Sequence, residues 1–414
     1  MTYGKAAVDW QQRVDFDRLR KDRLAKAHQM LHKWGIGASL IFNWDSGRYL
    51  GRPWNHPYAR HIPRHFVLIF RDAGFPYYPV SESDMRVLED MPWMEDRIVR
   101  DDVLCNPGVI YNRPWEDQEK RWAKTAAQIK SILKQHGVDG LPIGVDYASP
   151  IVIKSLENAG LKVVDGNAWI VEADTVKTDD EIELMRMAAT CNDLGFARLV
   201  REFTAGQTED HARALVASGL FDAGAEFLEG WITESGPRQA PRHLNWSDRV
   251  VRPGEFLTLE PCHVTYLGYK VCYSRTFLVS STRPTPIQKA LYETVAEMQQ
   301  RVAGLLKPGI TNHDWVRLRP VQKGPLKGLK DIGEFRASFS NHFGGMGIRY
   351  NGGPQPSLEE PEMVLEKNMC LAYAPQINVP GVAGCKIENT YRITDDGCES
   401  FCLWPYEDIP CIGL

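Results

Sequence analysis

The fold of this chain is decided by one stretch, Glu255-Phe-Leu-Thr-Leu-Glu-Pro-Cys-His-Val-Thr-Tyr-Leu-Gly-Tyr-Lys-Val-Cys-Tyr-Ser-Arg-Thr-Phe-Leu-Val279. Its two apolar runs are rich in the β-branched and aromatic residues that strands favour, and they predict a β-hairpin. The connection lies near Gly268, which can adopt the positive φ that a tight turn needs. We expect the two strands to fold back on each other about Tyr266 and Leu267.

Polar and thiol side chains gather on one face of this hairpin. Side chains alternate between the two faces of a strand, so Glu260 and Cys262 point the same way. The expected pairing places Cys272 opposite Cys262, and Ser274 near Glu260. A purely structural sheet would carry apolar side chains there, so this face is the first candidate for a functional site.

Length and composition limit the class of protein. The chain has 414 residues, of which 43% are hydrophobic and 25% charged, and its formal net charge is −4. This length predicts two domains or one large domain, and the mild acidity gives no reason to expect nucleic acid or a membrane surface as a partner. No apolar segment indicates a signal peptide or a membrane span. Nine scattered cysteines indicate reduced thiols and therefore a cytoplasmic protein.

Helical and strand patterns alternate in the first half of the chain. Amphipathic helices are predicted over 16–34, 120–136 and 151–158, buried strands over 38–42, 65–70 and 142–146, and a loop dense in aromatic and polar residues over 44–58. This alternation is typical of an α/β domain.

The second half begins with a helix signal at Thr178. Glu181 follows three residues later and completes a capping box, and acidic residues crowd the first turn of a helix predicted to end near Phe203. We therefore predict an α/β (α+β) protein of two domains, one over 1–175 and one over 176–414.

Three motifs of the second half resemble the pita-bread family, which includes creatinase, prolidase, aminopeptidase P and methionine aminopeptidase. Gly268-Tyr-x-x-x-x-x-Arg-Thr-Phe277 is similar to the central hairpin of that family, and 177–185 and 306–310 are similar to two of its other segments. The resemblance covers most of residues 176–405. It implies a pita-bread catalytic domain behind a creatinase-type N-terminal domain. It also implies a homodimer in which the N-terminal domain of one subunit covers the pocket of the other.

The metal-dependent members of this family hold a dinuclear site with five ligands. Its two hairpin aspartates correspond to Cys272 and to Pro261, which lies between Glu260 and Cys262. Its histidine opens a His-Gly-x-Gly motif and corresponds to Gly344. Three of the five ligands are therefore replaced here.

Of the two glutamate ligands of the family, one is replaced in this chain and the other is retained. The first corresponds to Ala374, or to Tyr373 if the register shifts by one, whereas the last is retained as Glu388. We therefore expect no metal and no other cofactor. A thiol-containing zinc site stays open as an alternative, with possible donors in Glu260, Cys262, His263, Cys272, His342 and Glu388.

Creatinase is a precedent within the family for catalysis without a metal. Its catalytic histidine lies twelve residues before the acidic residue that opens the hairpin strand, and His243 lies twelve residues before Glu255 here. A histidine can act as general base and then as general acid near neutral pH. Arg238, Arg242 and Trp246 flank His243 and indicate a pocket in which an arginine would grip a substrate carboxylate. The alternative is an ordinary surface histidine.

Two carboxylates and a thiol are further candidates. Glu260 and Glu388 would position substrate or water, and Glu388 could pair with Lys386 or act as an acid/base. Cys272 could be a nucleophile only if its thiolate were stabilised.

Four histidine and aromatic residues complete the candidate pocket. His342 lies beside a glycine-rich turn, and Tyr373 could orient a substrate or simply lie in the core. Trp54 and His56 belong to a segment similar to one in the dimethylsulfoniopropionate lyases built on this fold, and they could cover the pocket.

These candidates predict an enzyme. We expect a metal-independent, creatinase-like hydrolase that cleaves a C–N bond in a small polar compound, with His243 as general acid/base. A first alternative is a β-elimination lyase in which Trp54 and Trp246 hold a cationic substrate. The others are a metallopeptidase and a non-catalytic binding protein.

Overall fold

The structure is a computed structural model, and it describes residues 13–51, 66–72, 74, 76–79, 98–99, 102–105, 114–240, 245–318, 338–349, 353 and 357–414. The chain divides into two compact units, an N-terminal unit over Asp15–Asp174 and a C-terminal unit built mainly from Thr175–Leu414. None of the helices that the structure describes is long and apolar enough to cross a membrane.

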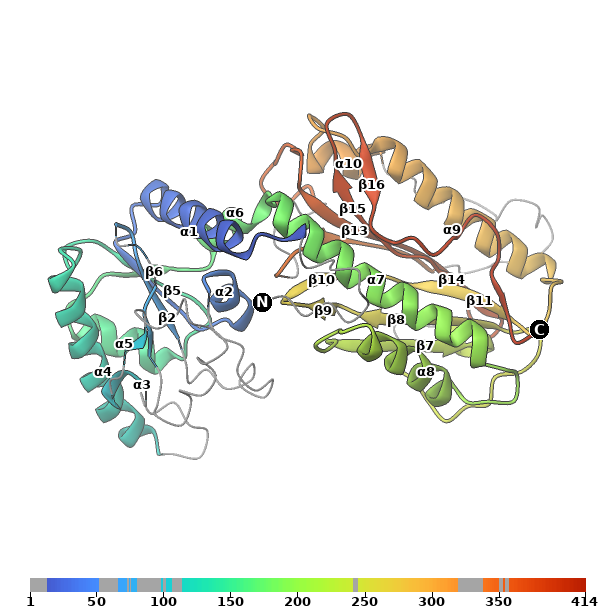
Figure 1. Ribbon diagram of the computed structural model, residues 1–414, viewed down its shortest axis with the longest axis horizontal. Helices are drawn as coiled ribbons and strands as arrows, with labels where there is room; N and C mark the ends of the chain where they lie inside the picture. The colour runs from blue at the N-terminus through green and yellow to red at the C-terminus, as the bar shows by residue number, and fades with distance from the viewer. Residues whose placement is uncertain are drawn as a thin grey trace. The chain divides into compact units, whose positions relative to one another are not determined.

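The N-terminal unit contains a mixed sheet with helices packed around it (Figure 1). Its strands are β1 (Ala38–Ile41), β2 (Val67–Phe70), β5 (Ile143–Val145) and β6 (Val163–Asp165), in the order β2-β1-β5-β6, beside a short pair of β3 (Tyr78–Pro79) and β4 (Ile98–Val99). Its helices are α1 (Phe16–Lys33), α2 (Trp44–Tyr49), α3 (Asp102–Cys105), α4 (Trp115–Gln135), α5 (Pro150–Asn158) and α6 (Ala168–Thr175). Strand β1 pairs antiparallel with β2 and parallel with β5, and the core includes the fully buried Trp122 of α4.

Side-chain caps mark the starts of two of these helices, one of which lies in a segment that was expected to be a loop. Asp15 caps α1, because its carboxylate accepts hydrogen bonds from the backbone N–H groups of Asp17 and Arg18 at 3.1 and 3.0 Å. The segment expected to be a loop begins instead with α2, which Asn43 caps by accepting from the Ser46 backbone N–H at 2.9 Å. A helix this short has too few turns to show an apolar period in the sequence.

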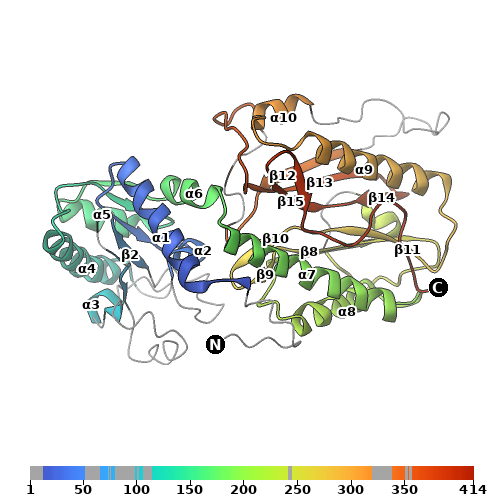
Figure 2. The same ribbon diagram turned by 45° about the horizontal axis from the view of Figure 1, so that its top comes forward.

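The C-terminal unit has helices on both sides of its strands. The helices are α7 (Asp179–Glu202), α8 (Glu209–Asp222), α9 (Pro286–Leu305) and α10 (Asn312–Leu318). One sheet has the order β17-β11-β8-β7, with bounds Cys411–Ile412, Arg275–Val279, Phe256–Cys262 and Gly230–Ser235. A second has the order β12-β13-β15-β16, with bounds Ser338–Gly345, Cys370–Val379, Asn389–Ile393 and Cys398–Ser400, and β14 (Ala383–Lys386) pairs with β13. Figures 1 and 2 show α7 and α8 on one side of these strands and α9 on the other.

The long helices of this unit start at reciprocal caps. Thr178 Oγ1 accepts from the Glu181 backbone N–H at 3.2 Å, and the Glu181 carboxylate accepts from the Thr178 backbone N–H at 2.7 Å. The predicted capping box of α7 is therefore confirmed. Thr285 and Gln288 form the same arrangement at the start of α9, which packs on β13 and β14 over an apolar core.

The hairpin has one residue more in its first strand than in its second. Beyond the β8–β11 pairing, the hairpin continues as β9 (Val264–Tyr266) and β10 (Tyr269–Val271). Residues 260–263 therefore face 272–274, which is a β-bulge, and His263 there has a left-handed φ of 51°. Leu267 and Gly268 form the tip with φ of 46° and 93°, one residue later than expected.

Candidate functional site

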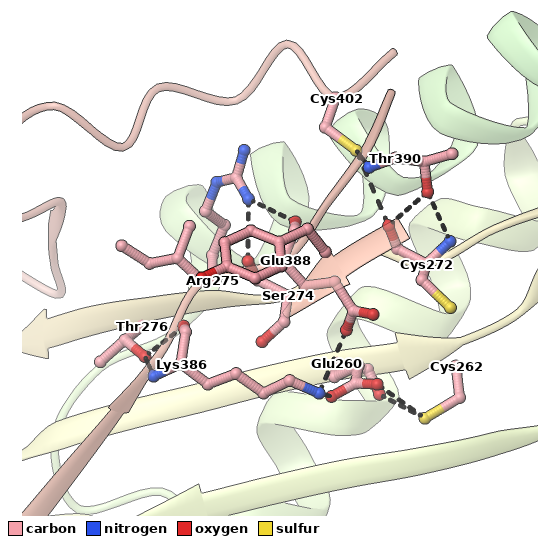
Figure 3. Close-up of polar contacts among 12 residues, drawn as sticks. Glu260, Cys262, Cys272, Ser274, Arg275, Thr276, Lys386, Glu388, Thr390 and Cys402 are labelled. Carbon is pink, nitrogen blue, oxygen red and sulfur yellow. Dashed lines mark hydrogen bonds and ion pairs between the residues drawn. The ribbon is translucent and has the colours of Figure 1, made fainter. Parts of the chain in front are cut away.

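A buried lysine joins two carboxylates in the C-terminal unit (Figure 3). Lys386, the last residue of β14, forms ion pairs with Glu260 of β8 and with Glu388, and its Nζ lies 3.1 Å from Glu388 Oε2. The side chains of Lys386, Glu260 and Glu388 are only 3%, 7% and 1% exposed. We call these three residues the carboxylate–lysine cluster.

Backbone contacts hold this cluster in place. Thr276 Oγ1 donates to the Lys386 carbonyl at 2.9 Å and accepts from the Lys386 N–H at 3.1 Å. Glu388 and Ser274 exchange backbone hydrogen bonds of 3.1 and 3.3 Å. The fully buried Arg275 donates to the carbonyls of Ser274 and Glu388 at 2.8 and 2.9 Å. The motif arginine of the hairpin therefore fastens it to the segment that carries the cluster.

Burial and charge act in opposite directions on the titrating groups of the cluster. Burial raises the pKa of the Glu388 carboxyl to about 7, because the Lys386 ammonium offsets only part of this effect and Glu260 adds repulsion. Burial would lower the pKa of Lys386, but Glu260 and Glu388 more than offset it and raise that pKa above its ordinary value. Lys386 therefore remains an ammonium at neutral pH, whereas Glu388 can hold or release a proton there.

Two thiols and a hydroxyl share this face with the cluster (Figure 3). Cys262 Sγ donates to Glu260 Oε1 at 3.4 Å, so these two side chains lie together as the strand alternation predicted. Burial and the charge of Glu260 raise the pKa of Cys262, and burial and the charge of Glu388 raise the pKa of Cys272. Both thiols stay protonated near neutral pH, so neither is the stabilised thiolate that a nucleophile needs. Among the described residues, the buried Ser274 Oγ has no hydrogen-bond partner.

Arg238 belongs to a second polar network. Its guanidinium pairs with the buried Glu209 and donates to Ser247 Oγ and to the Asn245 carbonyl, each at 2.9 Å. A substrate carboxylate would have to compete with Glu209 for this guanidinium. A role of Arg238 in substrate binding stays a prediction.

Two aromatic candidates pack against neighbours. Trp246 is 38% exposed, and the Arg213 guanidinium of α8 lies 4.1 Å from its ring centroid. Tyr373 on β13 is fully buried and packs edge-on against Trp315, with ring centroids 5.6 Å apart. Tyr373 was predicted either to orient a substrate or to lie in the core, and the structure places it in the core.

The remaining candidates are not placed by the structure. His243, Arg242, Trp54 and His56 lie outside the described residues, and His342 is placed only by its backbone, opposite Ala374 in the pairing of β12 with β13. Their roles in catalysis and binding stay predictions.

Comparison with known families agrees with the hairpin resemblance. The model of metallopeptidase family M24 matches residues 183–395, just over half of the 414 residues, and this segment contains the whole carboxylate–lysine cluster. The chain belongs to metallopeptidase family M24. The predicted relationship to the creatinase, prolidase and aminopeptidase P family is confirmed.

Relatives of this M24 member extend the agreement to the fold. The Xaa-Pro dipeptidase of Pyrococcus furiosus is 29% identical over 66% of this chain and 75% of its own length. The solved Xaa-Pro dipeptidase from Bacillus anthracis has a TM-score of 0.73 and 20% identity, over 95% of this chain and all of its own. The prolidase from Pyrococcus horikoshii OT3 has a TM-score of 0.68 and 21% identity, over 93% and 99%. The predicted two-domain pita-bread fold class is confirmed.

The same findings correct the predicted reaction. A metal-independent, creatinase-like hydrolase was expected, but the family is one of metallopeptidases and its relatives are named Xaa-Pro dipeptidases. That prediction relied on the replaced ligand positions and on the spacing from His243 to Glu255, and the match to a metallopeptidase family overturns it. The comparisons favour the peptidase alternative.

The residues that the structure describes do not fit the metal that this family implies. Within the described ranges, no group of three or more His, Cys, Asp and Glu side chains could hold a metal ion. The carboxylates of Glu260 and Glu388 are already paired with the Lys386 ammonium. No catalytic step through a metal follows from this geometry.

Sequence reasoning missed the most important contact of Lys386. The pairing of Lys386 with Glu388 was one of the two predicted roles of Glu388, and the structure has it; residues two apart in an extended segment share a face. The pairing with Glu260 joins positions 126 apart in the sequence and had no local signal.

Proposed function

We propose that this chain is a hydrolase that cleaves the amide C–N bond of a dipeptide or a similarly short peptide. The observation that carries this proposal is the match to family M24 over 183–395, which spans every residue of the carboxylate–lysine cluster. The names of the relatives, Xaa-Pro dipeptidases, make an Xaa-Pro dipeptide the first substrate to test.

The cluster offers groups that suit amide hydrolysis. The reaction needs a base that takes a proton from water and an acid that returns one to the leaving amine. Glu388 suits this exchange, because burial raises its pKa to about 7. The Lys386 ammonium would stabilise the negative charge that develops on the carbonyl oxygen, and Glu260 would hold the ammonium in position. His243 stays a candidate for a second proton carrier.

The location and assembly of the chain are part of the same proposal. We expect a cytoplasmic enzyme, because the eight cysteines whose side chains the structure describes are all free thiols. We expect a homodimer with Trp54 and His56 near the pocket of the partner subunit, and a small-molecule substrate as the ligand.

A dipeptide panel tests the function. Purified protein would be assayed by mass spectrometry on Xaa-Pro and Xaa-Ala dipeptides, both after chelation and with added Mn²⁺. We expect release of free amino acids from at least one Xaa-Pro dipeptide, and much slower release by Glu388→Gln. Saturable binding of these dipeptides without turnover under either condition would contradict the proposal and favour the binding-protein alternative.

A further inference from the structure

The carboxylate–lysine cluster already contains a cation at the place where two acidic side chains converge. Lys386 Nζ is paired with both Glu260 and Glu388, and all three side chains are buried. Charge pairs with this little exposure are weakly screened by solvent, so each partner strongly affects which other ions can enter.

We infer that the Lys386 ammonium is the resident cation of the carboxylate–lysine cluster, and that it keeps a divalent metal ion out of the space between Glu260 and Glu388. The inference does not rest on the proposed hydrolysis, because it concerns which cation the two carboxylates hold.

The backbone of Lys386 is fixed in its strand, so only the side chain could move aside for a metal ion. Its backbone N–H and carbonyl both bond to Thr276 Oγ1, at 3.1 and 2.9 Å, and β14 is paired along its length with β13. A divalent ion between Glu260 and Glu388 would lie against the ammonium, so the Lys386 side chain would have to turn away and lose both buried ion pairs before the ion could enter.

Among the side chains that the structure describes, too few other donors lie here to compensate for that displacement. A structural zinc site takes four ligands, and harder metals take more oxygen donors. The adjacent Cys262 thiol donates its hydrogen to Glu260, so it would have to lose that proton before it could bind a metal. The segment corresponding to the family's first glutamate contributes Ala374, which has no donor atom in its side chain.

Metal titration of the full chain tests this inference. Wild type, Glu260→Gln and Glu388→Gln would be dialysed against a chelator and then against Mn²⁺, Co²⁺ or Zn²⁺. Bound metal would be measured by elemental mass spectrometry, and Tm by calorimetry, since an ion that binds the native state raises Tm. We expect no stoichiometric metal and no rise in Tm for wild type. Stoichiometric metal that wild type binds and both glutamine variants lose would overturn the inference. Metal that both variants retain would be bound at another site, and Lys386 would still be the cation between Glu260 and Glu388.

Removal of the lysine gives the second arm of the test. Lys386→Ala leaves two carboxylates without their cation, so we expect its Tm to rise with a divalent ion or with methylammonium. The matched control is Lys270→Ala, which removes another buried lysine, whose Nζ lies 3.0 Å from Glu229. It should show no such rise, because His263 Nδ1 still lies 2.8 Å from that carboxylate. If Lys386→Ala folds and neither ion raises its Tm, the ammonium is not what excludes the metal and the inference fails. If it does not fold, the three-protein titration decides.

Discussion

The Glu388 carboxyl changes protonation near neutral pH, because burial raises its pKa to about 7 from an ordinary value of 4.5. We expect Glu388→Gln to lower kcat by about 10²–10⁴-fold, the usual effect of removing a general acid/base, and to remove the limb of the pH–rate profile near pH 7. Stopped assays from pH 5 to 9 would measure both effects, with the exposed Glu359→Gln as control. An unchanged profile in Glu388→Gln would assign the limb to another group.

The same carboxyl makes stability depend on pH in a definite direction. Between about pH 4.5 and pH 7 the native state keeps a proton on Glu388 that the unfolded chain releases. Its contribution to the free energy of unfolding is therefore fully present below pH 4.5 and is lost as the pH rises through 7. Urea titrations should show a larger loss of stability from pH 5 to 8 in wild type than in Glu388→Gln. Equal losses would mean that Glu388 has an ordinary pKa.

His243 carries a prediction that rests on the sequence. A histidine twelve residues before Glu255 could be a second proton carrier in hydrolysis. If so, His243→Asn should lower kcat on a dipeptide substrate by at least about a hundredfold and change KM far less. A near-normal kcat would leave proton transfer to Glu388.

Strand β14 positions the lysine of the cluster, and Gly384, which has no Cβ, lets its neighbours approach this strand closely. A Cβ at Gly384 would lie 2.7 Å from the Gln239 carbonyl oxygen, so Gly384→Ala should push the strand away. Overpacking of this kind costs about 1–3 kcal/mol. We expect a lower urea midpoint and a lower kcat together. Gly304→Ala, at an exposed position on α9 with no atom within 4 Å of the added Cβ, should instead stabilise by about 0.5–1 kcal/mol.

The assembly of the whole molecule is predicted to complete the pocket. The segment with Trp54 and His56 is rich in aromatic and histidine side chains, which suits a covered surface better than one exposed to water. Light scattering should therefore give twice the chain mass of 47.0 kDa, and Trp54→Ala should raise KM for a dipeptide. A monomer with full activity would contradict both expectations.

The sequence by itself determined the elements whose signals are local. The hairpin followed from β-rich runs around Gly268, and the start of α7 followed from Thr178 and Glu181, which are one helical turn apart. Glu260 and Cys262 could be placed on one face because alternation acts within a single strand. The family followed from motifs that are contiguous in the chain.

Only the tertiary structure decided what each candidate side chain contacts. Lys386 meets Glu260 because β14 and β8 are brought together by the packing of their sheets, across 126 positions of sequence. Long-range packing likewise brings Arg238 into an ion pair with Glu209 and buries Tyr373 in the core. Burial, which raises the pKa of Glu388 and keeps the Cys262 thiol protonated, is a property of these long-range contacts. The sequence shows which residue types are available for the site. The protonation states and contact partners of these residues depend on which strands pack together.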